Sequence, residues 1–81
     1  MKSLRTPEHK KLIALLTTAR EKAGMTQQQL ADKLGKPQSF VAKYEGGERR
    51  VDVVELITLS QALGFDPARA IREVAAEYGK K

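Results

Sequence analysis

The sequence contains no cysteine and no tryptophan, and its 81 residues include a single histidine. Without cysteine the chain can form neither a disulfide nor a thiolate metal site, which fits a reducing cytoplasm. His9 has no second histidine or cysteine with which to complete a catalytic triad or a zinc site. Because it stands among charged residues, we expect a solvated side chain. We therefore expect no enzyme activity, no cofactor and no metal.

The sequence also lacks a long apolar run, so we expect neither a transmembrane helix nor a signal-peptide core. At 81 residues the chain is long enough for one domain only, spanning residues 1–81. The net charge of +5 is concentrated in residues 1–50, which hold eleven Lys and Arg against five Asp and Glu. This basic half suits a polyanion such as nucleic acid, although a small basic domain can also be basic only for solubility.

Helix-start and helix-stop signals divide the chain into five expected helices with no strand between them, an all-α fold. The expected starts are Thr6-Pro7, Thr26 with Gln29, Pro37, Asp52 with Glu55, and Asp66-Pro67. The expected stops are Gly24, Gly35, Gly46-Gly47 and Gly64, with a frayed tail at residues 79–81.

The last two helices carry apolar residues at helical spacing. In the fourth, we expect a buried side made of Val53, Leu56, Ile57, Leu59, Ser60 and Leu63. In the fifth, Ala70, Ile71, Val74 and Tyr78 form one stripe. That stripe covers either the chain's own core or a second subunit, and the pattern does not choose between them.

Only Gly35 and Lys36 separate the second helix from Pro37. A turn this short makes two helices cross steeply, as in a helix-turn-helix, where the second helix can lie in the DNA major groove. At about 100° per residue, the third helix places Gln38, Ser39 and Lys43 on one arc and its aromatic residues on the other. Gln, Ser and Lys suit base edges. An ordinary amphipathic surface helix would give the same pattern.

Polar groups near the two ends of this motif predict contacts to the DNA backbone. The first turn of a helix can bind a phosphate through its free N–H groups, although helix capping alone would explain the polar residues there. The two glycines after the third helix would let the backbone approach DNA closely, although the arginines that follow can also be explained as solvated charges. The residues expected to contact phosphate are Gln27, Gln28, Lys36, Gly47, Arg49 and Arg50.

The stretch "MTQQQLADKLGKPQSFVAKYEGGERR", with Arg20 before it and Ala62-Leu63-Gly64 after it, resembles the XRE-type helix-turn-helix family, which includes the Cro and lambda-type repressors. The resemblance covers about residues 10–73 and leaves residues 74–81 as a C-terminal extension. It implies a five-helix, lambda-repressor-like domain with the helix-turn-helix at the second and third helices.

The resemblance also assigns roles. It implies base reading by Gln38, Ser39 and Lys43, and a partly buried ion pair between Arg20 and Glu45. Two positions, Pro37 and Phe40, depart from the family pattern.

Pro37 stands where many relatives have Ser or Thr, so the third helix starts without a hydroxyl cap. Phe40 is bulkier than the usual small residue. It either packs on the second helix, which we favour, or protrudes beside a thymine methyl group.

By this resemblance we expect a sequence-specific transcriptional regulator of double-stranded DNA, acting as a repressor and as a homodimer on a palindromic operator. The alternative is a protein-interaction module, such as an antitoxin whose main work is to bind a toxin, with the fifth helix and the tail as its contact.

Overall fold

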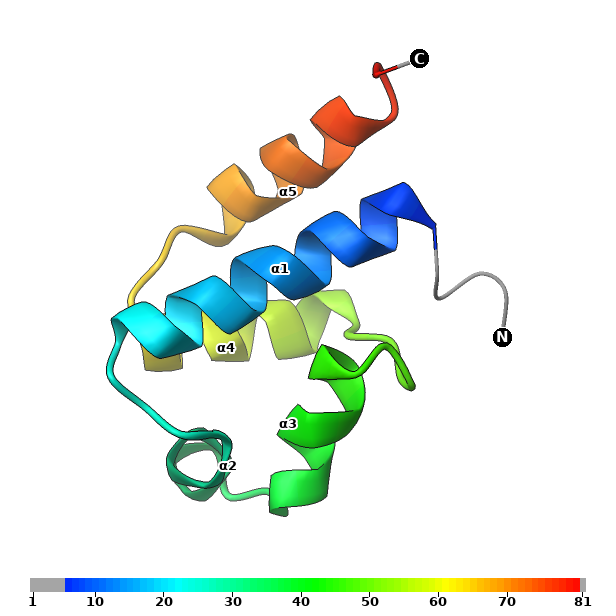
Figure 1. Ribbon diagram of the computed structural model, residues 1–81. Helices are drawn as coiled ribbons and strands as arrows, with labels where there is room; N and C mark the ends of the chain where they lie inside the picture. Colours follow the sequence, from blue (N-terminus) through cyan, green and yellow to red (C-terminus); the bar gives the residue numbers. More distant parts are fainter. Residues whose placement is uncertain (1–5, 81) are drawn as a thin grey trace.

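The computed structural model describes residues 6–80, which form five α-helices joined by short loops (Figure 1). The helices are α1 (Pro7–Lys22), α2 (Gln27–Leu34), α3 (Gln38–Glu45), α4 (Val53–Leu63) and α5 (Pro67–Glu77). No strand occurs among the described residues. The predicted all-α, five-helix fold is confirmed. Lys81, part of the tail expected to fray, lies outside the described residues.

The helix boundaries follow the capping residues. Thr26 and Gln29 form a capping box at α2, with Thr26 Oγ1 accepting the Gln29 N–H and Gln29 Oε1 accepting the Thr26 N–H. Asp52 and Glu55 form the second capping box at α4. Gly35 ends α2 with φ of +69°, a left-handed conformation that glycine adopts without steric cost. Local capping chemistry therefore sets both ends of α2 and the start of α4.

The core lies where α1, α2, α3 and α4 meet. α1 runs through the middle of the molecule, with α5 along one side of it and α3 on the other, while α2 packs on α3 and α4 (Figure 1). The buried apolar residues of this core are Leu16, Leu30, Ala31, Phe40, Val41, Tyr44, Leu56 and Leu59. Because three of the eight come from the short α3, that helix is firmly embedded on one side.

Two of the residues expected to be buried in α4 are not. Val53 is 63% exposed and Ile57 is 43% exposed, whereas Leu56, Leu59 and Ser60 are buried. α4 is apolar almost all round, and the helices packed against it cover only one arc of it. The prediction was wrong because periodicity cannot locate the covered arc of a helix whose apolar residues surround the axis.

The stripe on α5 divides in the same way. Ala70 is buried and Val74 is half-buried, while Ile71 and Tyr78 are 51% and 65% exposed. α5 therefore covers the chain's own core, chiefly against α1, with only part of the stripe.

His9 is buried at 7% exposure, so the expectation of a solvated side chain was wrong. It lies at i, i+3, i+4 and i+7 spacing with Leu12, Ile13 and Leu16, and so it continues their buried face. Burial, and secondly the positive charge of Arg50, lowers the pKa of His9. Both effects disfavour the protonated form of the imidazole.

Candidate nucleic-acid interface

The outer face of α3 is polar and exposed. Gln38, Ser39 and Lys43 are all exposed, and Ala42 between them is half-buried. The structure thus brings the three residues predicted to read bases onto one solvent-facing arc of one helix. An amide, a hydroxyl and a flexible cation are side-chain types that hydrogen-bond to base edges in the major groove.

The inner face of α3 is an aromatic and aliphatic anchor. Val41 and Tyr44 are fully buried, and Phe40 is 9% exposed and stacks edge-to-face on Tyr44 with a centroid distance of 5.5 Å. Phe40 therefore packs into the core rather than protruding, as we favoured. Burial, and then the nearby charge of Glu45, raises the pKa of Tyr44. This face fixes the rotation of α3, and with it the direction of the polar face.

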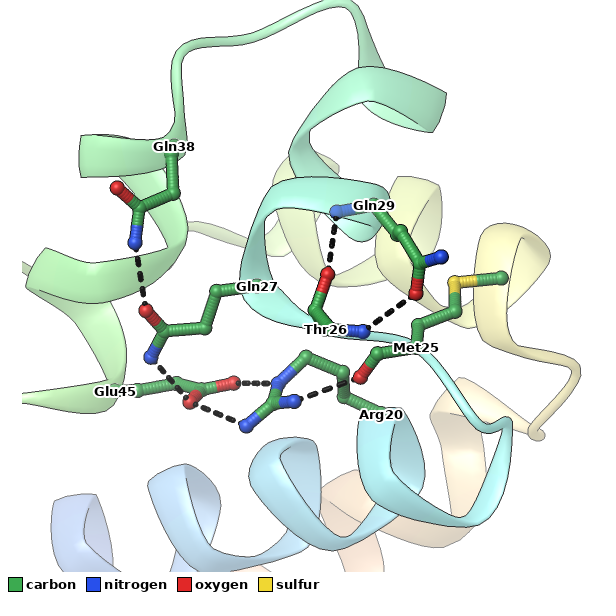
Figure 2. Close-up of polar contacts among 7 residues, drawn as sticks. All are labelled: Arg20, Met25, Thr26, Gln27, Gln29, Gln38 and Glu45. Carbon is green, nitrogen blue, oxygen red and sulfur yellow. Dashed lines mark hydrogen bonds and ion pairs between the residues drawn. The ribbon is translucent and has the colours of Figure 1, made fainter.

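Arg20 and Glu45 join α1 to the last residue of α3. Arg20 Nε donates to Glu45 Oε2 at 2.8 Å and Nη2 donates to Oε1 at 3.1 Å, while Nη1 donates to the Met25 carbonyl at 2.7 Å (Figure 2). The side chains are only 13% and 7% exposed. The hydrogen bond to Glu45 is the largest cause that raises the pKa of Arg20. This bidentate geometry is the strong form of an arginine–carboxylate pair.

The ion pair extends as a chain of hydrogen bonds to the first residue of α3. Gln27 donates from Nε2 to Glu45 Oε1 at 3.0 Å, and Gln38 donates from Nε2 to Gln27 Oε1 at 2.9 Å (Figure 2). One polar chain thus runs from Arg20 on α1, over the start of α2, to the exposed Gln38. The hydrogen bond to Gln27 therefore orients the Gln38 amide in the absence of a ligand.

Gln28, the other glutamine of the α2 first turn, is placed differently. Its amide donates to Asp32 Oδ1 at 2.8 Å, one turn along the same helix, and the side chain is exposed. A phosphate contact by Gln28 stays a prediction, and it would require the amide to leave Asp32.

The corner after α3 contains an ion pair that the sequence analysis missed. Arg49 donates from Nη1 and Nη2 to the two carboxylate oxygens of Glu55 at 3.1 and 3.0 Å. The hydrogen bond with Arg49 is the largest cause that lowers the pKa of Glu55. Arg49, predicted to contact phosphate, is thus already bound to a carboxylate. The hint in the sequence was Glu55 itself, because its place in the capping box sets it close to the preceding loop.

Arg49 also lies over the ring of Phe40, with the guanidinium carbon 4.7 Å from the centroid, and Lys36 Nζ lies 5.2 Å from the same centroid. The ring therefore attracts two cations, one from each of the turns that flank α3. Gly47, with φ of +76°, makes the corner possible. Lys36, Arg49 and Arg50 thus stand in the turns on either side of the polar face of α3.

Within residues 6–80 no group of three or more His, Asp or Glu side chains could hold a metal ion. None of the described helices is both long and apolar enough to cross a membrane.

The model of a helix-turn-helix family matches residues 16–69, which is most of the chain. A solved structure described as an XRE-family like protein from Pseudomonas syringae pv. tomato str. DC3000 is 41% identical. It covers 94% of this chain and 93% of its own, with a TM-score of 0.82. The chain belongs to the XRE helix-turn-helix family.

A second solved structure, of a mutant of the restriction-modification controller protein C.Esp1396I, shares the fold at 21% identity and a TM-score of 0.75. It covers 93% of this chain and 95% of its own. None of the curated proteins compared matches the chain. The XRE-family fold makes this chain a DNA-binding domain of the regulator type, with α2 and α3 as its helix-turn-helix.

Proposed function

We propose that this XRE-family protein is a sequence-specific transcriptional regulator that represses by binding a palindromic operator as a homodimer. The observation that supports it best is the hydrogen-bonded chain from Arg20 through Glu45 and Gln27 to Gln38. A reading residue held in place before binding loses less side-chain entropy when it meets a base. In this proposal Gln38 pairs with adenine, Lys43 with guanine, and Ser39 with either.

Contacts to the DNA backbone come from the two turns beside α3 and from the start of α2. The proposed set is Gln27, Gln28, Lys36, Gly47, Arg49 and Arg50. Cations in this set displace counterions from the phosphates, so affinity falls as salt rises. Arg49 takes part if a phosphate replaces Glu55 as the partner of its guanidinium. Gly47 contributes its backbone, because glycine has no side chain to hold the DNA away.

Repression follows from occupancy of a promoter by a dimer. Two copies related by a two-fold axis place their α3 helices about 34 Å apart, one helical turn of DNA, so that each reads a half-site. A dimer bound there excludes polymerase.

Selection of bound sequences from a random duplex pool tests the proposal. We expect an enriched inverted repeat whose half-sites are centred about one helical turn apart. Lys43→Ala, run in parallel, should lose preference at one base pair in each half-site. A pool that stays random after repeated rounds at low salt would contradict sequence-specific reading.

One observation favours a second candidate function, the protein-interaction module. Ile71 and Tyr78 leave two large apolar side chains exposed on α5, which a partner such as a toxin could cover. Partner binding that survives Lys43→Ala but fails in Ile71→Glu, together with no binding to duplex DNA at low salt, would establish it.

A further inference from the structure

A groove of about 540 Å³ lies between α1 and α5, which pack along each other (Figure 1). Leu63, the last residue of α4, and residues 64–66, which connect it to α5, complete the lining. Pockets that bind small molecules have volumes of about 300–1,000 Å³. The residues proposed to contact DNA, all of which the structure describes, lie outside the lining, as do Ile71 and Tyr78. The groove is therefore a separate feature, large enough for a small ligand.

Small side chains keep the groove open. Its walls include Gly64 and four alanines: Ala14, Ala19, Ala23 and Ala70. A Cβ atom placed on Gly64 would meet no described atom within 4 Å beyond its neighbours in the chain. α1 and α5 therefore pack against each other without filling the space on this side of their contact.

Part of the lining is apolar. Leu15, Leu63 and Phe65 all face the groove, and each is half-buried. Leu63 and Phe65 also pack against the core, which holds them in place. A ligand that covers these three side chains removes apolar surface from water, which favours a ligand with an apolar body.

The charges of the groove leave one cation without a partner. Its ionisable residues are Lys11, Lys22, Asp66, Arg69 and Glu73, three cations against two carboxylates. Glu73 pairs with Arg69 at 3.1 Å and with Lys11 at 3.9 Å. Asp66 caps α5 by accepting a backbone N–H. Lys22 is exposed and makes no hydrogen bond or ion pair with any residue of the described chain. A ligand anion would supply the missing partner.

We propose that this groove binds a small amphipathic carboxylate. Its apolar body lies against Leu15, Leu63 and Phe65, and its carboxylate pairs with Lys22. A cationic amphiphile would instead bring a like charge to Lys22. The site goes beyond the proposed function and does not depend on it, because its lining shares no residue with the proposed DNA contacts.

Titration of the ¹⁵N-labelled full chain with octanoate, followed by the chemical shifts of its backbone amides, tests the proposal. We expect saturable shifts at the groove, including the amides of Ala19 and Gly64, with a dissociation constant of about 0.1–1 mM. Octan-1-ol has the same tail without charge, and octylammonium has it with a positive charge. Because an exposed ion pair contributes little, octan-1-ol should bind about two- to fivefold more weakly than octanoate, and octylammonium more weakly still.

Three outcomes of the titration would overturn the proposal. One is the absence of saturation with octanoate up to about 10 mM. Another is binding of octan-1-ol as tight as that of octanoate, which would mean that the groove has no preference for an anion. The third is a set of shifts centred on the exposed Val54 or Tyr78, which would place the tail on another apolar surface.

Lys22→Glu tests the assigned charge. Lys22 is the exposed last residue of α1, so the variant should fold. It should reverse the preference, so that octylammonium binds more tightly than octanoate. Lys10→Glu is the matched control, since Lys10 is an exposed lysine of the same helix outside the lining, and it should keep the native order. Equal shifts of the order in both variants would assign the preference to the net charge of the chain and overturn the proposal.

Ala19→Leu tests the place of the apolar body. The larger side chain occupies part of the groove, so octanoate and octan-1-ol should both bind more weakly. Unchanged binding of both compounds to an Ala19→Leu chain that gives a native-like amide spectrum would overturn the proposal.

Discussion

Two arginine–glutamate pairs flank α3, and their surroundings differ. Arg20 and Glu45 meet at 2.8 Å with side chains 13% and 7% exposed. Arg49 and Glu55 meet at 3.0 Å with side chains 38% and 18% exposed. Both are bidentate, so the hydrogen-bond geometry is nearly the same. The difference lies in how far water reaches each charge and in what else each arginine contacts.

Because of this difference, the buried pair is expected to stay intact, whereas the exposed pair can exchange its partners. Glu45 is nearly inaccessible to water and accepts hydrogen bonds from both Arg20 and Gln27. Removal of the arginine therefore leaves a buried carboxylate without a cation. Arg49 lies at the surface over an aromatic ring, where solvent or a phosphate can replace Glu55. We infer that the first pair fixes the orientation of α3, while the second sets how much positive charge the corner offers.

The largest effect should come from Arg20→Met. It leaves Glu45 without its cation, and we expect a loss of about 3 kcal/mol in the free energy of unfolding, measured by urea denaturation. Gln38 should also lose its fixed orientation, because the hydrogen-bonded chain to it starts at this pair.

The control is the double variant Arg20→Met with Glu45→Gln, which removes the stranded charge but keeps an acceptor for Gln27. It should be more stable than Arg20→Met alone. If Arg20→Met lowered the free energy of unfolding no more than loss of the exposed Arg49–Glu55 pair does, the distinction between the two pairs would be contradicted.

Glu55→Gln should have a smaller effect, a loss below about 1 kcal/mol, because exposed pairs contribute little and glutamine at this position can still form the capping box. The pKa of Glu55 is lowered in the folded protein, chiefly by Arg49. Its contribution is therefore present above the ordinary glutamate pKa and lost as pH falls through the folded value. Urea titrations at several acidic pH values should show a flatter decline for the variant. If stability declined equally with pH in the native chain and the variant, the Arg49–Glu55 pair would contribute nothing to stability.

Glu55→Gln should strengthen DNA binding although it lowers the stability of the fold. Release of Arg49 from Glu55 adds one unpaired cation to the corner, so affinity should rise for all duplex sequences alike. The slope of log affinity against log salt should steepen by up to about 1. Fluorescence anisotropy on specific and random duplexes measures both quantities. An unchanged slope would indicate that Arg49 does not reach a phosphate.

The smallest effect concerns His9, which lies near the charge of Arg50. Its lowered pKa means that the unfolded chain binds a proton more readily than the folded chain below the ordinary value of 6.5. Stability should therefore fall as pH drops from that value toward the folded pKa. His9→Gln should remove this decline, as thermal melts between pH 7 and pH 5 would reveal. A decline of the same size in the variant would assign it to other groups.

The sequence predicted the fold well because capping boxes, glycine stops and short turns are local signals. It also predicted which face of α3 is buried, since a two-turn helix with three apolar residues on one arc has one way to pack. It failed for Val53, Ile57 and His9, whose burial depends on which neighbours cover them. The ion pair between Arg49 and Glu55 was also missed, because it depends on the conformation of the loop that carries Arg49.

The central claim is that α3, fixed from behind by Arg20 and Glu45, reads bases with its outer face. The most direct test is the affinity of native protein and Lys43→Ala for the selected operator and for each single base-pair change in one half-site. We expect Lys43→Ala to lose about 1–3 kcal/mol of discrimination at one position and to keep its preferences elsewhere. Unchanged affinity and unchanged preference at every position would contradict it.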